Sequence, residues 1–170
     1  LCDHSGPRIP ARLNDLDMSH DDLHRHIAWD IGIDGVGRGL SSHFDACLIM
    51  QPYSRLVIDC NRRPGSETSI LAESDGTKIP GNQPLSANDI HMRVREIFDP
   101  YHRKISSHLD GRRDAGRPTI LVSLHSFTPV YGDIPRPWHA GVLYNRYPDL
   151  SLAMLKLLDA EGDIVVGNNE

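Results

Sequence analysis

Short apolar runs rich in β-branched residues alternate with helical patterns along this chain, and this alternation constrains its fold more than any other feature. The runs cover residues 46–52, 55–59, 118–127, 139–146 and 163–167. Each has the length and composition of a buried strand. The helical patterns cover residues 20–43, 86–105 and 149–160. Strands that alternate with helices predict an α/β sandwich with a mostly parallel sheet.

The segment 86–105 carries the strongest helical pattern in the chain. Ser86 and Asp89 have the spacing of a capping box, and apolar residues follow them at steps of three and four. Pro100 is expected to kink this helix or to divide it, because proline cannot donate to the helical hydrogen-bond ladder. Residues 62–85 are rich in proline, glycine and serine, so we expect no regular element there.

Ligands of parallel sheets bind beyond the carboxyl ends of the strands, and the turn after residues 55–59 is one such place. It presents Asn61 and Arg62, and an arginine fork beside an amide suits a carboxylate group. This turn is therefore a candidate anion clamp, with a solvated basic turn as the alternative. Arg55 is expected either to join the substrate site or to pair with Asp59.

Any metal ion must be held by histidine and carboxylate, because the three cysteines show no CxxC spacing. His125 ends an apolar run, and His4 lies in the opening turn CDHSG. Two imidazoles, one carboxylate and an open position make a common catalytic zinc site. Asp30 is the candidate carboxylate, because an unpaired charge in its apolar context is costly. The alternatives are a hydrogen-bonded histidine at a sheet edge and a capping or salt-bridged aspartate.

The composition argues against large polyanionic partners, whereas a small-molecule anionic substrate stays compatible with it, because local arginine clusters can override the net charge. The net charge is −5, from 18 basic and 23 acidic residues without long runs, which argues against binding to nucleic acid or an anionic membrane. No stretch approaches the roughly 20 apolar residues of a membrane span, and no signal-peptide pattern opens the chain. We therefore expect a cytoplasmic protein, and its 170 residues suit a single domain.

Several sequence blocks together carry a resemblance to a known family. They are CDHSG followed by IP, RHIAWDIG, YSRLVIDCNR, SDGTKIPGNQPLS, IFDPYH, LHSFTPV and RPWHAGVLYNR. Each block alone is a weak signal, but the blocks together occur in the order of one known family and cover nearly the whole chain. In this respect the chain resembles the N-formylglutamate amidohydrolases, which are similar to zinc carboxypeptidases and aspartoacylase-like deacylases in fold and site.

The resemblance implies a three-layer α/β/α sandwich with a mixed, mostly parallel sheet, formed by residues 1–170 as a single amidohydrolase domain. It implies that His4 and His125 are the two zinc imidazoles. It also implies that Asn61 and Arg62 grip the substrate's α-carboxylate. The related enzymes carry a glutamate three residues after the first zinc histidine, where this chain has Pro7. The carboxylate ligand must then come from elsewhere, and Asp30 is our candidate.

The implied reaction is hydrolysis of the N-acyl bond of an acidic N-acyl amino acid, typified by N-formyl-L-glutamate giving formate and L-glutamate in histidine degradation. The relatives use a glutamate on a late strand as general base. We expect this base to lie beyond residue 170, with Glu170 as the candidate within the chain, and we expect the first strand and the C-terminal segment of the family to be missing. The alternatives are another N-acyl amino acid deacylase, a carboxypeptidase-like enzyme, or a non-catalytic relative that binds anions.

Overall fold

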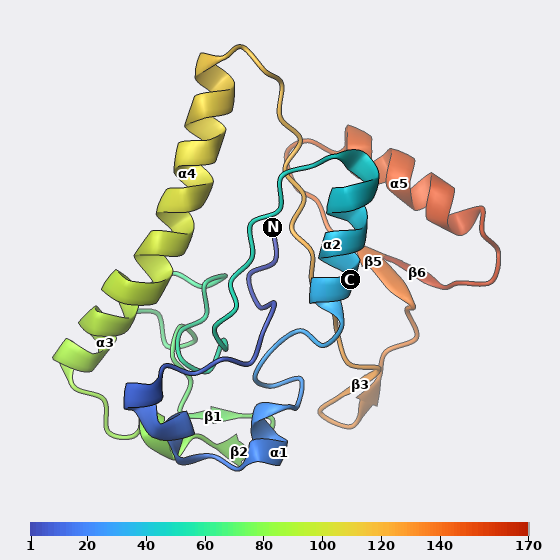
Figure 1. Cartoon of the computed structure of the whole chain (residues 1–170). Helices are drawn as coiled ribbons and strands as arrows, with labels where there is room; N and C mark the ends of the chain where they lie inside the picture. The colour runs from blue at the N-terminus through green and yellow to red at the C-terminus, as the bar shows by residue number, and fades with distance from the viewer. Residues whose placement is uncertain (170) are drawn as a thin grey trace. The chain divides into compact units, whose positions relative to one another are not determined.

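The computed structural model describes residues 1–169, which form two compact units (Figure 1). The first unit is Leu1–Phe127, and the second begins at Thr128. Both units combine helices with short strands, so the predicted α/β class is confirmed. The described residues form three two-stranded sheets, of which one is parallel and two are antiparallel. Regular strands therefore contribute less parallel sheet than the alternation of patterns predicts.

The helical patterns of the first unit all form helices. Its helical elements are η1 (Ala11–Asp17), α1 (His20–Leu23), α2 (Ile33–Phe44), η2 (Pro80–Asn82), α3 (Ala87–Arg93), η3 (Val94–Phe98) and α4 (Asp99–Asp114). The pattern over 20–43 thus gives two helices, and the pattern over 86–105 gives a longer helical stretch that ends at Asp114. These local predictions are confirmed.

The start and the division of the longest helical stretch follow from three residues. The Ser86 hydroxyl accepts from the Asp89 N–H at 3.1 Å, and the Asp89 carboxylate accepts from the Ser86 N–H at 3.1 Å, which is the predicted capping box. Pro100 lies in the first turn of α4, directly after the π-helical turn η3. The missing N–H of proline is compatible with a first turn, so the division falls there.

Residues 55–59 and 62–85 differ from the sequence expectations in this unit. Residues 55–59 form a turn instead of a strand, because the Ser54 hydroxyl and carbonyl accept from the N–H groups of Leu56 and Val57. The apolar side chains of this turn are nevertheless buried, so burial alone does not require a strand. The segment 62–85 also contains a hairpin of β1 (Glu73–Ser74) and β2 (Thr77–Lys78), besides η2.

Extended segments supply the parallel pairing that places the site. The N-terminal segment lies between residues 49–53 and residues 122–124 (Figure 1). The Cys2 N–H donates to the Ile49 carbonyl at 3.0 Å, and a parallel bridge joins Cys2 to Met50. On the other side, the Leu124 N–H donates to the Leu1 carbonyl at 2.9 Å. Residues 46–52 and 118–127 thus flank the opening segment, but the prediction that they form buried strands is wrong. They contact it through isolated bridges and single backbone hydrogen bonds instead of a regular ladder, and the side chains of Ile120 and Leu121 are exposed.

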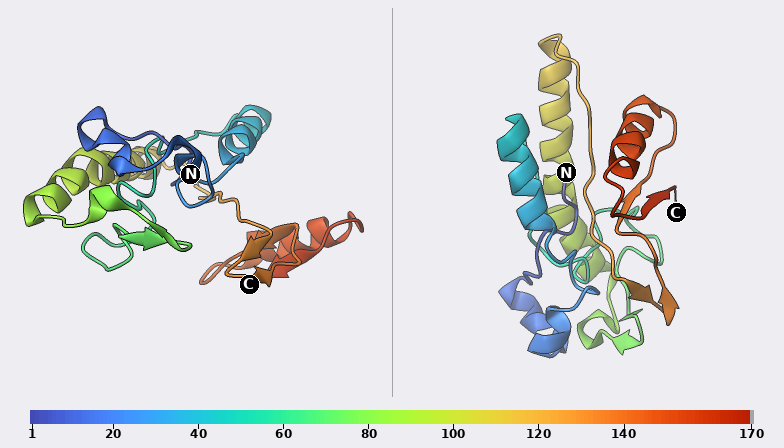
Figure 2. Two further views of the ribbon diagram at one scale, coloured as in Figure 1. Left: turned by 90° about the horizontal axis from the view of Figure 1, so that it is seen from below. Right: turned by 90° about the vertical axis from the view of Figure 1, so that its right-hand side faces the viewer.

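The second unit is built around a parallel pair of strands joined by a helix. Its elements are β3 (Val130–Tyr131), β4 (Ile134–Pro135), β5 (Ala140–Val142), α5 (Asp149–Asp159) and β6 (Val166–Asn168). β5 and β6 pair in parallel, and α5 packs against both (Figure 2). This strand, helix and strand occupy the regions where the sequence predicts them, with β6 shifted by a few residues.

The core of the first unit joins the long helix to the buried turn. Ile97, Tyr101 and Ile105 are buried and belong to the same apolar cluster as Leu56 and Val57. The steps of three and four that predict the helix therefore mark its buried face. Among the described helices, none is long and apolar enough to cross a membrane.

Candidate metal centre

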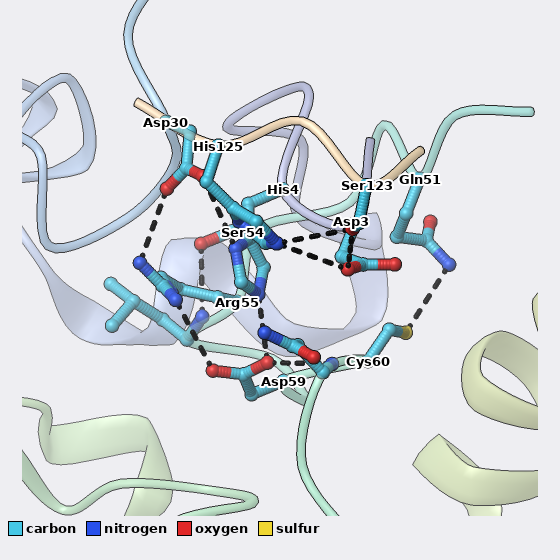
Figure 3. A network of polar contacts seen from close by, with 12 residues as sticks. Asp3, His4, Asp30, Gln51, Ser54, Arg55, Asp59, Cys60, Ser123 and His125 are labelled. Carbon is cyan, nitrogen blue, oxygen red and sulfur yellow. Dashed lines mark hydrogen bonds and ion pairs between the residues drawn. The ribbon is translucent and has the colours of Figure 1, made fainter. Parts of the chain in front are cut away.

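The three residues predicted as metal ligands meet in the first unit (Figure 3). His4, Asp30 and His125 each offer a donor atom, and these atoms lie within 4.8 Å of one another. Asp30 Oδ2 lies 2.9 Å from His125 Nδ1 and 3.5 Å from His4 Nδ1. One carboxylate oxygen is thus next to both ring nitrogens, as the ligands of a single ion require.

Local structure explains this convergence. His4 follows the extended N-terminal segment, and His125 follows residues 122–124, which pair with it in parallel. Carboxyl ends of neighbouring parallel segments meet at the same edge, so two histidines far apart in sequence become neighbours. Asp30 lies just before α2, and its N–H donates to the His4 carbonyl at 2.9 Å. That hydrogen bond holds Asp30 next to His4.

His4 is fully buried, and Asp59 determines which of its nitrogens is free. Its Nε2 lies 2.7 Å from Asp59 Oδ1, and the same oxygen accepts from the Asn61 N–H at 2.8 Å. A carboxylate can only accept, so the His4 proton lies on Nε2 and the Nδ1 lone pair faces Asp30 and His125. His4 Nδ1 is buried and has no hydrogen-bond partner among the described residues. A metal ion would satisfy this atom.

His125 has a second carboxylate behind it. Its Nε2 lies 3.4 Å from Asp3 Oδ2 and 3.3 Å from the Ser123 hydroxyl. The Ser123 hydroxyl also donates to Asp3 Oδ2 at 3.2 Å, and the Tyr101 hydroxyl donates to Asp3 Oδ1 at 2.6 Å. Each imidazole of the cluster therefore presents one nitrogen to Asp30 and the other to an aspartate that is not a candidate ligand.

Arg55 bridges two carboxylates of the cluster. Its guanidinium donates to Asp30 Oδ1 at 3.2 Å and to Asp59 Oδ2 at 3.4 Å. The predicted pairing with Asp59 is thus present, and Asp30 has the arginine partner that the sequence left open. Asn61 and Arg62 follow on the exposed surface of the same turn, where their role as an anion clamp stays a prediction.

The charges of the cluster suit a divalent cation. Asp3, Asp30 and Asp59 supply three carboxylates, and Arg55 supplies one guanidinium. With neutral imidazoles, three negative charges against one positive charge leave two negative charges in excess. An uncompensated excess of this kind is costly in a buried place. Protonation of the histidines would offset this excess, and so would a divalent ion bound by them.

The pKa values of the cluster reflect the same balance. Hydrogen bonds to Asp3 and Asp30 raise the pKa of His125 to about 9. Burial works against the charged form of His4, but Asp30 and Asp59 nevertheless raise its pKa. Burial also disfavours ionised Asp30, yet its contacts with the two histidines lower its pKa. Donors of these kinds, two nitrogens and one carboxylate oxygen, are those that zinc prefers, so the residues fit such an ion.

Several supporting residues were not predicted as part of the site. The sequence indicates Asp59 only as a partner of Arg55, and Tyr101 only as part of the apolar helix face. Asp3 stands beside His4 in the opening turn, and this adjacency is the one signal in the sequence that points to it. Glu170, the candidate base, lies outside the described residues.

The comparisons with known proteins agree with the resemblance seen in the sequence. The chain matches the family model described as N-formylglutamate amidohydrolase over residues 1–170. The crystal structure of a gene product from Agrobacterium tumefaciens is similar to it, with a TM-score of 0.93 and 38% sequence identity. That match covers 99% of this chain and 67% of the other. No curated protein matches the chain. The family match over the whole length shows that the chain belongs to the N-formylglutamate amidohydrolase family.

Proposed function

We propose that this protein is a zinc-dependent amidohydrolase that cleaves the N-acyl bond of an acidic N-acyl amino acid, typified by N-formyl-L-glutamate. The observation that carries the proposal is the convergence of His4, Asp30 and His125, with the buried His4 Nδ1 lacking a hydrogen-bond partner among the described residues. The family match supports the reaction class. The convergence supports the metal dependence, because the donor set suits zinc.

In this proposal His4, Asp30 and His125 hold the ion. When bound, zinc supplies Lewis acidity that lowers the pKa of water and polarises the amide carbonyl. Asn61 and Arg62 would bind the α-carboxylate of the substrate and so orient its acyl group in the site. Arg55 keeps Asp30 and Asp59 oriented, and its partly exposed side chain is also available to the substrate.

The proposal includes the fold implied by the resemblance, a three-layer α/β/α sandwich like that of the zinc carboxypeptidases. The parallel pairing of the opening segment with residues 49–53 and 122–124 supports it. The parallel pair β5 and β6, joined through α5, supports it as well. In such sheets the carboxyl edges carry the ligands, and the position of each histidine after one of the paired segments supports the proposal.

Removal of zinc is expected to abolish the release of formate from N-formyl-L-glutamate, and added zinc is expected to restore it. The reason is that no other group of the cluster replaces Lewis acidity at the carbonyl. Formate is measured with a coupled assay, and zinc content by elemental analysis. Unchanged turnover in protein shown to be metal-free would contradict the proposal. Parallel assays with N-acetyl-L-glutamate and N-formyl-L-leucine separate preference for the acyl group from preference for the side chain.

Substitution of Arg62 by alanine is expected to raise KM about 10- to 100-fold while zinc content stays unchanged. A hydrogen bond to a charged group contributes about 1.5–3 kcal/mol, which corresponds to this range. Arg103→Ala on the exposed surface of α4 is the matched control, with KM unchanged. An unaltered KM in Arg62→Ala would remove Arg62 from the substrate site. Loss of ligand binding in a protein without any turnover would favour the non-catalytic anion binder.

A further inference from the structure

Asp3 is a buried carboxylate whose contacts lead from the long helix to the candidate metal centre. Figure 3 shows it beside Ser123 and His125. One of its oxygens, Oδ1, accepts from the Tyr101 hydroxyl, which α4 supplies, at 2.6 Å. The other, Oδ2, accepts from the Ser123 hydroxyl and lies 3.4 Å from His125 Nε2. The exposed fraction of Asp3 is only 6%, so substrate has little access to it.

These contacts distinguish Asp3 from a proton-transferring group. The Tyr101 hydroxyl donates to one of its oxygens, and the Ser123 hydroxyl donates to the other, which also lies within ion-pair distance of His125 Nε2. Both oxygens are therefore directed at protein donors. Its chemistry is therefore that of a fixed acceptor.

The need for such an acceptor differs between the two histidines. His4 is fully buried, and the surrounding core restricts its ring. The side chain of His125 is 34% exposed, so packing alone restrains its ring less. Histidines that bind metals commonly donate their second N–H to a carboxylate, which fixes the tautomer and the ring orientation. Asp59 serves His4 in this way at 2.7 Å.

We infer that Asp3, held by Tyr101, is a positioning residue for His125: it accepts the Nε2 proton of His125 and leaves the Nδ1 lone pair directed at the site beside Asp30. This inference rests on the proposed function, since it concerns the metal that the proposal places there. It makes α4 part of the metal site, because Tyr101 orients the aspartate that orients the ligand. If Asp3 only held α4 against the opening segment, the contact between its Oδ1 and Tyr101 would be sufficient. The contacts of Oδ2 with Ser123 and His125 would then have no role.

The test measures zinc affinity and not only activity. Asp3→Asn is expected to weaken zinc binding about 10- to 100-fold, as loss of such a partner does elsewhere. Tyr101→Phe keeps the aspartate but frees its carboxylate, and a net hydrogen bond of about 1 kcal/mol corresponds to roughly fivefold weaker binding. Asp45→Asn on the exposed surface after α2 is the matched control. Affinity is obtained by competition with a coloured chelator.

The visible spectrum of the cobalt-substituted protein supplies a second readout. Both variants are expected to change the cobalt bands, because the orientation of the His125 ring changes. Wild-type affinity and wild-type bands in folded Asp3→Asn would overturn the inference, and a loss of urea stability alone would show a merely structural tie. If Asp3→Asn does not fold, Tyr101→Phe decides the question by the same criteria. Wild-type protein that binds no metal would instead overturn the proposed function, so the two failures are distinguishable.

Discussion

Asp30→Asn is expected to eliminate stoichiometric zinc and to lower kcat/KM for formate release by more than 100-fold. Asp30 Oδ2 lies next to the ring nitrogens of both His4 and His125, so it is the one donor that touches the other two. Asparagine has nearly the same shape but no charge, and it makes a far poorer zinc ligand. Loss of a direct ligand should exceed the roughly 10- to 100-fold cost of losing a supporting partner.

Zinc content by elemental analysis and zinc affinity by chelator competition check this result, with Asp45→Asn as the exposed control. Asp30 is buried and pairs with Arg55, so the metal-free variant is also expected to lose stability, by about 3 kcal/mol if the buried pair is fully broken. Urea unfolding separates this loss from the loss of metal. A folded Asp30→Asn protein that retains one zinc per chain would show that the ion is held elsewhere.

The affinity for zinc is expected to rise with pH up to about 9. Hydrogen bonds to Asp3 and Asp30 raise the pKa of His125 to about 9 in the metal-free protein, and a ligand histidine must lose its proton before it binds. Below that pH, protonation of His125 alone is therefore expected to weaken zinc binding about tenfold for each unit by which the pH falls. Between pH 8 and pH 6 the expected loss is about 100-fold. The raised pKa of His4 acts in the same direction.

The stability of the metal-free protein should follow the opposite trend. A folded pKa above the unfolded value of about 6.5 means that protonated His125 stabilises the fold below pH 6.5. That contribution is lost as the pH rises through about 9. The carboxylates behave inversely, because the lowered pKa values of Asp3 and Asp30 stabilise the fold above about pH 4 and cease to do so on acidification.

Zinc titrations at pH 6, 7 and 8, in buffers that do not bind metal, test the first trend. Proton release on zinc binding, followed in weakly buffered solution, provides an independent check. We expect release of about one proton or more below pH 8. An affinity that stays constant between pH 6 and pH 8, without proton release, would show that the histidines are already neutral in the metal-free protein.

Local features of the chain were predictable because their causes are local. The capping box of Ser86 and Asp89, the division at Pro100 and the apolar face of the long helix all depend on residues within one or two turns. Residues 55–59 show where local reasoning fails. An apolar run indicates that its side chains are buried, but it does not determine the backbone conformation. Here the Ser54 hydroxyl and carbonyl accept hydrogen bonds that form a turn where a strand was expected.

The sequence by itself determined the family and the candidate ligands His4, Asp30 and His125, because residue types in a conspicuous motif order carry that information. Only the tertiary structure decided which groups support them. Asp59 lies 55 residues from His4, and Tyr101 lies 98 residues from Asp3. Contacts over such separations arise from the parallel pairing of extended segments and from the packing of α4, which no local pattern encodes. The candidate metal ligands were thus predictable from the motifs, whereas the orientation of each imidazole depends on carboxylates that folding brings behind it.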